Sequence, residues 1–89
     1  MRQVFYTTKF DKDVTLQKRR GKDPNKLKEV MALLIKGQQL PAQYRDHKLQ
    51  GDFAGFRDCH IEGDWLLIYK LDGENIYFTR TGTHADLFE

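Results

Sequence analysis

Cysteine and proline are scarce in this chain of 89 residues, which has one cysteine, Cys59, and two prolines. A single thiol cannot form an intrachain disulfide, so the chain is not a small secreted scaffold held together by disulfides. The expected environment is therefore a reducing cytoplasm.

Long apolar runs are missing as well. Met1–Phe10 lacks the apolar stretch of a signal peptide, and no run approaches the roughly 20 apolar residues that span a bilayer. No repeat, low-complexity tract or linker interrupts the chain. With 39% hydrophobic and 31% charged residues, the composition is that of a globular protein rather than a disordered one. We expect one soluble domain over residues 1–89 with no membrane partner.

The net charge of +2 is distributed unevenly along the chain. Residues 1–30 contain nine Lys or Arg against four Asp or Glu, whereas residues 31–89 contain six against nine. A basic first part predicts a polyanionic or acidic partner, although a solvated helix surface would have the same composition.

Two helices are predicted in the first part of the chain. A β-branched and aromatic run at Val4–Thr7 predicts a short strand before them. The first helix is expected from Phe10 to about Arg20, and the second follows Asp23 as N-cap and ends before Gly37. The second helix has apolar residues at the i, i+3, i+4, i+7 positions, namely Leu27, Val30, Met31 and Leu34.

The rest of the chain, from His47 onward, favours strands. Their connections are too short for parallel crossovers, which need about a dozen residues, so the pairing should be antiparallel. Trp65–Leu71 is apolar on both faces and is expected to be central. The predicted class is α+β, with two helices on one face of a largely antiparallel sheet of four to five strands. The predicted strands are His47–Gln50, Gly55–Ile61, Trp65–Leu71 and Asn75–Thr81.

Polar side chains are predicted to gather on the sheet face away from the helices. Alternation in Gly55–Ile61 places Asp58 and His60 on that face and leaves Cys59 as a buried, inert thiol. Residues near this hairpin and after the last strand would join them. The candidate set is His47, Asp58, His60, Asp64, Trp65, Arg80, His84 and Phe88.

This inventory suits RNA cleavage without a metal. Attack of a ribose 2′-hydroxyl on the neighbouring phosphate needs a base, an acid and cations. Imidazole, with a pKa of about 6.5, suits both proton roles, and each transfer contributes about 10²- to 10⁴-fold. Arg80 would hold the phosphate, and Trp65 or Phe88 would stack on a base, although burial is the competing expectation for Trp65.

Two other interpretations of the histidines stay open. Each of the three could have only a structural hydrogen-bonding role. Together with a carboxylate they could instead bind zinc, although no closely spaced pair of histidines anchors two ligands on one element.

Three segments of the chain resemble the YafQ-type toxins of the RelE superfamily. These segments are Asp46–Gly51, Gly55–Lys70 and Arg80–Phe88. The helix that begins at Pro24 and the loop through Leu40–Pro41 are similar too, so the resemblance covers almost the full length.

The resemblance implies a RelE-like fold and a ribosome-dependent mRNA interferase, the toxin of a type II toxin-antitoxin pair. Such a toxin cuts mRNA in the A site of the 70S ribosome without a cofactor and stops translation. A DinJ-like antitoxin would neutralise it, and operator DNA would be contacted only through that antitoxin. The basic helices would face ribosomal RNA or the acidic antitoxin. A RelE-like binding module without useful catalysis is the alternative.

By motif, the resemblance also implies residue roles. We expect His84 to be the general acid and His47 or His60, with Asp64, to be the base. The residues carried over by motif are His47, His60 and His84 with the carboxylates Asp58 and Asp64, the phosphate-binding Arg80, and Phe88.

Overall fold

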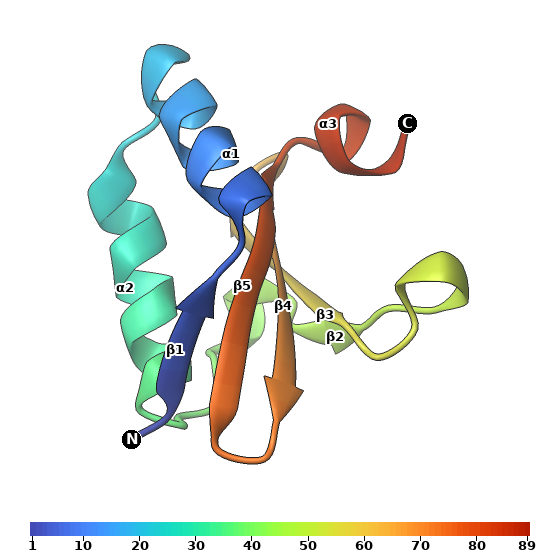
Figure 1. Ribbon diagram of the computed structural model, residues 1–89. Coiled ribbons are helices and arrows are strands. Elements are labelled where there is room, and N and C mark those ends of the chain that lie inside the picture. Colours follow the sequence, from blue (N-terminus) through green and yellow to red (C-terminus); the bar gives the residue numbers. More distant parts are fainter.

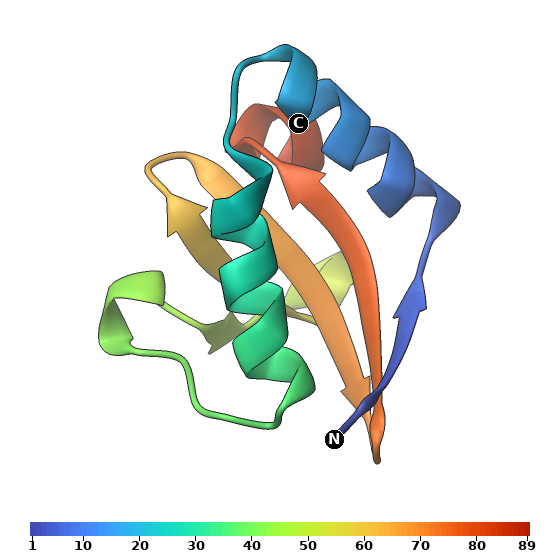
Figure 2. The same ribbon diagram turned by 90° about the vertical axis from the view of Figure 1, so that its left-hand side faces the viewer.

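The computed structural model describes residues 1–89 as a five-stranded sheet in the order β1-β5-β4-β3-β2. Helices α1 and α2 lie on one side of the sheet, and α3 lies on the other side near the C-terminus (Figure 1, Figure 2). The elements are β1 (Gln3–Tyr6), α1 (Thr8–Arg19), α2 (Pro24–Ile35), the 3-10 turn η1 (Ala42–Tyr44), β2 (His47–Lys48), the 3-10 turn η2 (Gly51–Phe53), β3 (Arg57–Glu62), β4 (Trp65–Asp72), β5 (Asn75–Gly82) and α3 (His84–Phe88).

The two long helices begin at side-chain caps. The hydroxyl of Thr7 accepts a hydrogen bond from the Phe10 amide, so α1 starts before the first residue of its apolar stripe. Asp23 accepts from the Asn25 amide and Pro24 occupies the first turn of α2, as predicted. None of the helices is long and apolar enough to cross a membrane.

The strand pairing confirms the α+β class and adds one parallel pair. The four strands from His47 onward pair antiparallel, as their short connections require. β1 instead runs parallel to β5, with Val4 opposite Ile76. β2 is shorter than predicted because the chain turns into η2 after the Leu49 amide has bonded to the Phe56 carbonyl.

The main core lies between the sheet and the helices α1 and α2. Cys59 and Ile61 are buried there, as alternation in β3 predicts, and burial raises the pKa of the Cys59 thiol. Every residue of β4 from Trp65 to Tyr69 is buried, which confirms its central place.

The opposite face of the sheet has a second, smaller core. Leu66 and Ile68 of β4 pack against Leu87 of α3, with Phe53 and Phe56 beside them. This face was predicted to be open, and that prediction is wrong because α3 and the loop around η2 cover part of it. The sequence pattern that indicates α3 is the capping box formed by Thr83 and Asp86. This pattern was not used in the prediction of the helices.

Candidate active site

The buried carboxylate of Asp58 lies beside His47 and interacts electrostatically with His60 and His84. Asp58 is in β3 opposite His47 of β2, and its Oδ1 lies 3.5 Å from the His47 Nδ1. The side chain is 3% exposed, and Oδ1 has no hydrogen-bond partner. Burial raises the pKa of Asp58 above its ordinary value, and the charges of His47, His60 and His84 oppose that rise. Segments far apart in the sequence thus place their imidazoles around one carboxylate.

His47 is held in a defined tautomer by the backbone. Its Nδ1 lies 2.7 Å from the carbonyl oxygen of Arg45. A carbonyl oxygen only accepts hydrogen bonds, so Nδ1 has the proton and the Nε2 of the neutral ring has a free lone pair. The ring is 52% exposed, so this nitrogen is accessible to a substrate.

Asp64 is paired with His84. Its Oδ1 accepts from the His84 backbone amide at 3.0 Å and is in hydrogen-bond contact with the His84 Nδ1. These contacts lower the pKa of Asp64. The expectation that Asp64 assists His47 or His60 is therefore wrong, because the turn between β3 and β4 directs Asp64 to the start of α3. The Nε2 of His84 is left for other partners.

His60 and Phe88 lie on either side of His84. The ring centroids of His60 and His84 are 6.0 Å apart, and those of His84 and Phe88 are 6.1 Å apart. A hollow of about 310 Å³ adjoins His60. Phe88 is 40% exposed and contacts Phe53 edge-on, with ring centroids 5.3 Å apart. Sequence reasoning missed Phe53, which has no motif of its own.

Arg80 in β5 is held in an ion pair by Asp13 of α1. The Arg80 Nε and Nη2 donate to the two carboxylate oxygens at 2.7 and 3.2 Å, and the Thr81 amide donates to the same carboxylate at 3.1 Å. The hydrogen bonds that Arg80 donates to Asp13 raise the pKa of Arg80. Two of the five N–H donors of the guanidinium are thus engaged, and three are left for a ligand.

Comparison with known proteins agrees with this geometry. The family model for the YafQ toxin of bacterial type II toxin-antitoxin systems matches residues 2–89. This chain belongs to the YafQ toxin family. The mRNA interferase toxin YafQ of Escherichia coli strain K12 is 53% identical over 88 residues, which cover 98% of this chain and 96% of the relative.

Solved YafQ structures confirm the predicted RelE-like fold. The crystal structure of YafQ from E. coli strain BL21(DE3) has a TM-score of 0.96 at 51% identity, and the match covers both chains completely. YafQ in the E. coli DinJ-YafQ complex has a TM-score of 0.93 at 52% identity, again with complete coverage.

In this member of the YafQ family Trp65 is a core residue. It is 1% exposed, and its indole Nε1 donates to the Thr81 hydroxyl at 2.9 Å. That hydroxyl donates to the Leu66 carbonyl at 2.6 Å. The prediction that Trp65 stacks on a substrate base is wrong, because the indole points from the central strand into the core under the helices.

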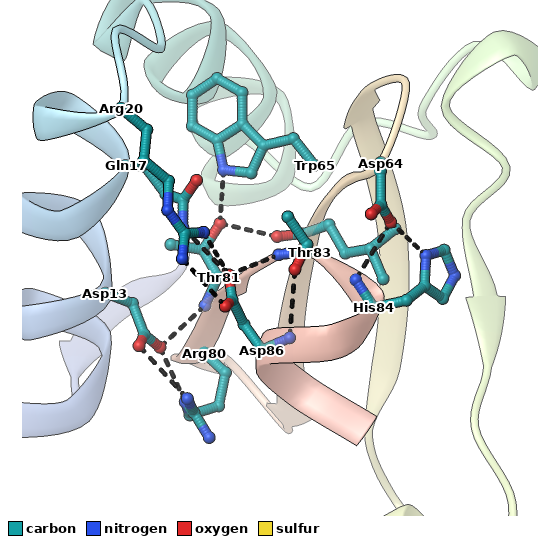
Figure 3. A network of polar contacts seen from close by, with 11 residues as sticks. Asp13, Gln17, Arg20, Asp64, Trp65, Arg80, Thr81, Thr83, His84 and Asp86 are labelled. Carbon is teal, nitrogen blue, oxygen red and sulfur yellow. Dashed lines mark hydrogen bonds and ion pairs between the residues drawn. The ribbon is translucent and has the colours of Figure 1, made fainter. Parts of the chain in front are cut away.

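A second carboxylate, Asp86, anchors α3 (Figure 3). It accepts from the Arg20 Nη1 and Nη2 at 2.6 and 3.2 Å, from the Gln17 Nε2 at 3.3 Å and from the Thr83 amide at 2.9 Å. The bond from Arg20 holds the pKa of Asp86 well below its usual range. A Cβ at Gly82 would lie 2.8 Å from the Oδ2 of this carboxylate, so a side chain there would displace Asp86 from its contacts.

No group of three or more His, Cys, Asp or Glu side chains is arranged to hold a metal ion. The three histidines bond instead to a backbone carbonyl, to a carboxylate, or to no protein group.

Proposed function

We propose that this chain is an mRNA interferase, the endoribonuclease toxin of a type II toxin-antitoxin pair. Membership of the YafQ family and the relatives named mRNA interferase toxin support this function. The observation on which the proposal rests most directly is geometric: His47 lies 3.5 Å from the Asp58 carboxylate, and the ring centroids of His60 and His84 are 6.0 Å apart. RNA cleavage without a metal needs such an acid and base at one phosphodiester.

In the proposed reaction the Nε2 of His47 takes the proton from the ribose 2′-hydroxyl. The Arg45 carbonyl supports this choice, since it fixes the proton of the neutral ring on Nδ1. The freed oxygen attacks the adjacent phosphorus and forms a 2′,3′-cyclic phosphate, while the 5′-oxygen leaves.

His84 gives a proton to that leaving 5′-oxygen. Its contact with Asp64 through Nδ1 orients the ring and leaves Nε2 for the leaving group. Acid and base are thus separate rings on separate elements, α3 and β2, and one proton is taken for each proton given.

The phosphate needs positive charge as it passes through the pentavalent state. His60, 6.0 Å from His84, supplies it when protonated, and Arg80 supplies its three remaining N–H donors. The exposed ring of Phe88 stacks on a base beside the cut.

The ribosome is the proposed site of action. The surface of α1 and α2 is basic, and a polyanion docked there releases counterions. A DinJ-like antitoxin is the proposed neutralising partner, because the YafQ of E. coli has been solved in a DinJ-YafQ complex. An acidic antitoxin segment would compete with ribosomal RNA for the same basic surface.

Expression of the chain in bacteria tests this function. We expect growth arrest within minutes, new mRNA 5′ ends inside translated coding sequences in one reading-frame register, and relief of both by a co-expressed DinJ-type antitoxin. Sequencing of RNA 5′ ends before and after induction provides the measurement. Arrest with intact messages would reject cleavage and support a binding module that blocks the ribosome.

A further inference from the structure

One face of α1 is polar and is directed at the end of β5 and the start of α3. Asp13, Gln17 and Arg20 are four and three residues apart, a spacing that aligns side chains on one side of a helix. Figure 3 shows all three turned toward the segment Arg80–Asp86. This segment includes both Arg80 and His84 of the proposed cleavage site.

The contacts hold the segment at both ends. Before the turn at Gly82, the Asp13 carboxylate accepts hydrogen bonds from the Arg80 guanidinium and the Thr81 amide. After the turn, the Asp86 carboxylate accepts a hydrogen bond from Arg20. Asp86 at the same time accepts from the Thr83 amide, so the first turn of α3, where His84 lies, is attached to α1.

The polar contacts of this α1 face are not the most stabilising way to pack the helix. Gln17 is 2% exposed, and its Oε1 has no partner. Apolar side chains of similar volume would stabilise a helix contact at least as well as buried polar groups do. Directional bonds do, however, fix the orientation of a guanidinium and of a helix start, which dispersion contacts do not.

We propose that α1 is a clamp that positions the C-terminal half of the cleavage site, with Asp13 orienting Arg80 and Arg20, through Asp86, orienting His84. This inference rests on the proposed function. By engaging the Nε edge of Arg80, Asp13 directs the remaining N–H donors to the phosphate. By holding Asp86, Arg20 keeps the His84 ring in its contact with Asp64.

Two substitutions on α1 test the clamp against matched controls on the same helix. Asp13→Asn is compared with Asp11→Asn, and Arg20→Ala with Arg19→Ala. Asp11 and Arg19 are exposed and make no side-chain hydrogen bond or ion pair, so each control removes the same charge without the contact. Single-turnover cleavage of mRNA in ribosome complexes is measured over a range of toxin concentrations.

Each clamp variant is expected to lower the maximal cleavage rate by about tenfold to 10²-fold, since small displacements of reacting groups have effects of this size. The toxin concentration at half-maximal rate should match that of its control. In the free protein, Arg20→Ala should also shift the ring resonances of His84, and Arg19→Ala should not. Thermal unfolding establishes that each variant is folded.

The possible results of these experiments test the clamp and the proposed function separately. If the wild type leaves ribosome-bound mRNA intact, the proposed function is wrong. If the wild type cuts but Arg20→Ala behaves like Arg19→Ala in rate and in His84 resonances, the clamp is wrong. An effect confined to the half-maximal concentration would assign α1 to docking and also reject the clamp. Should Asp13→Asn fail to fold, the surface variant Arg20→Ala still decides.

Discussion

Messenger RNA in the ribosomal A site is expected to be cut roughly 10⁵-fold faster, or more, than the same RNA free in solution. Correct orientation of reacting groups contributes about 7 to 11 kcal/mol to a barrier, more than the about 3 to 5 kcal/mol of one proton transfer. An enzyme that obtains orientation from its surroundings therefore loses most of its rate without them.

The geometry of the site is the reason for this expectation. The side chains of His47 and His84 are 52% and 56% exposed, and they lie on a surface rather than inside a deep pocket. The one hollow beside His60 is about 310 Å³, close to the lower limit for small-ligand sites. No hollow beside these histidines surrounds a nucleotide on several sides, and the proposed function therefore assigns its orientation to the ribosome.

The comparison uses one message, with its codon either in the A site of a stalled ribosome or free at the same concentration and salt. Raising the salt concentration should slow the ribosomal reaction steeply, because basic residues of α1 and α2 release counterions from ribosomal RNA. Equal rates on the two substrates would refute ribosome dependence and would show that the chain orients RNA by itself.

Replacement of His84 by alanine is expected to abolish growth arrest and to slow cleavage about 10²- to 10⁴-fold, the usual contribution of a positioned general acid. The fold should survive. The ring is exposed and fills no part of either core, so the free energy of unfolding should change by about 0.5 kcal/mol or less.

The matched control is Asp72→Ala, a change at the exposed last residue of β4, which should leave cleavage unchanged. Binding of the antitoxin by His84→Ala should also be unchanged. A His84→Ala protein that still arrests growth would reject catalysis by this ring and would favour a RelE-like binding module.

Local chemistry predicted the two long helices and the antiparallel pairing of the strands from His47 onward. Asp23, Pro24 and the apolar spacing after them determine α2 within the segment itself, and the short turns from Glu62 onward allow only hairpins. The parallel pairing of β1 with β5 joins residues at opposite ends of the chain, and α3 is too short to show a helical period.

The site was predicted as a set of residues but not as a set of contacts. Alternation in β3 placed Asp58 and His60 on one face of the sheet. It did not predict that Asp58 would be buried, because the small core on that face includes α3, which is distant in the sequence. Asp64 and His84 are 20 residues apart, and Asp13 and Arg80 are 67 apart, so spacing could not pair them. For Trp65, the apolar pattern of the strand predicted burial correctly, and the alternative of stacking on a base was wrong.

The chemistry of the cut ends tests the central proposal, that imidazoles alone drive 2′-hydroxyl attack, most directly. Mass spectrometry of A-site mRNA cut by the wild type should find a 2′,3′-cyclic phosphate and a 5′-hydroxyl, with the rate unchanged by EDTA once the ribosomes are intact. A message with a single 2′-deoxy nucleotide at the cut should stay whole. Cutting of that message, or loss of activity on chelation with 5′-phosphate ends, would contradict the proposed mechanism.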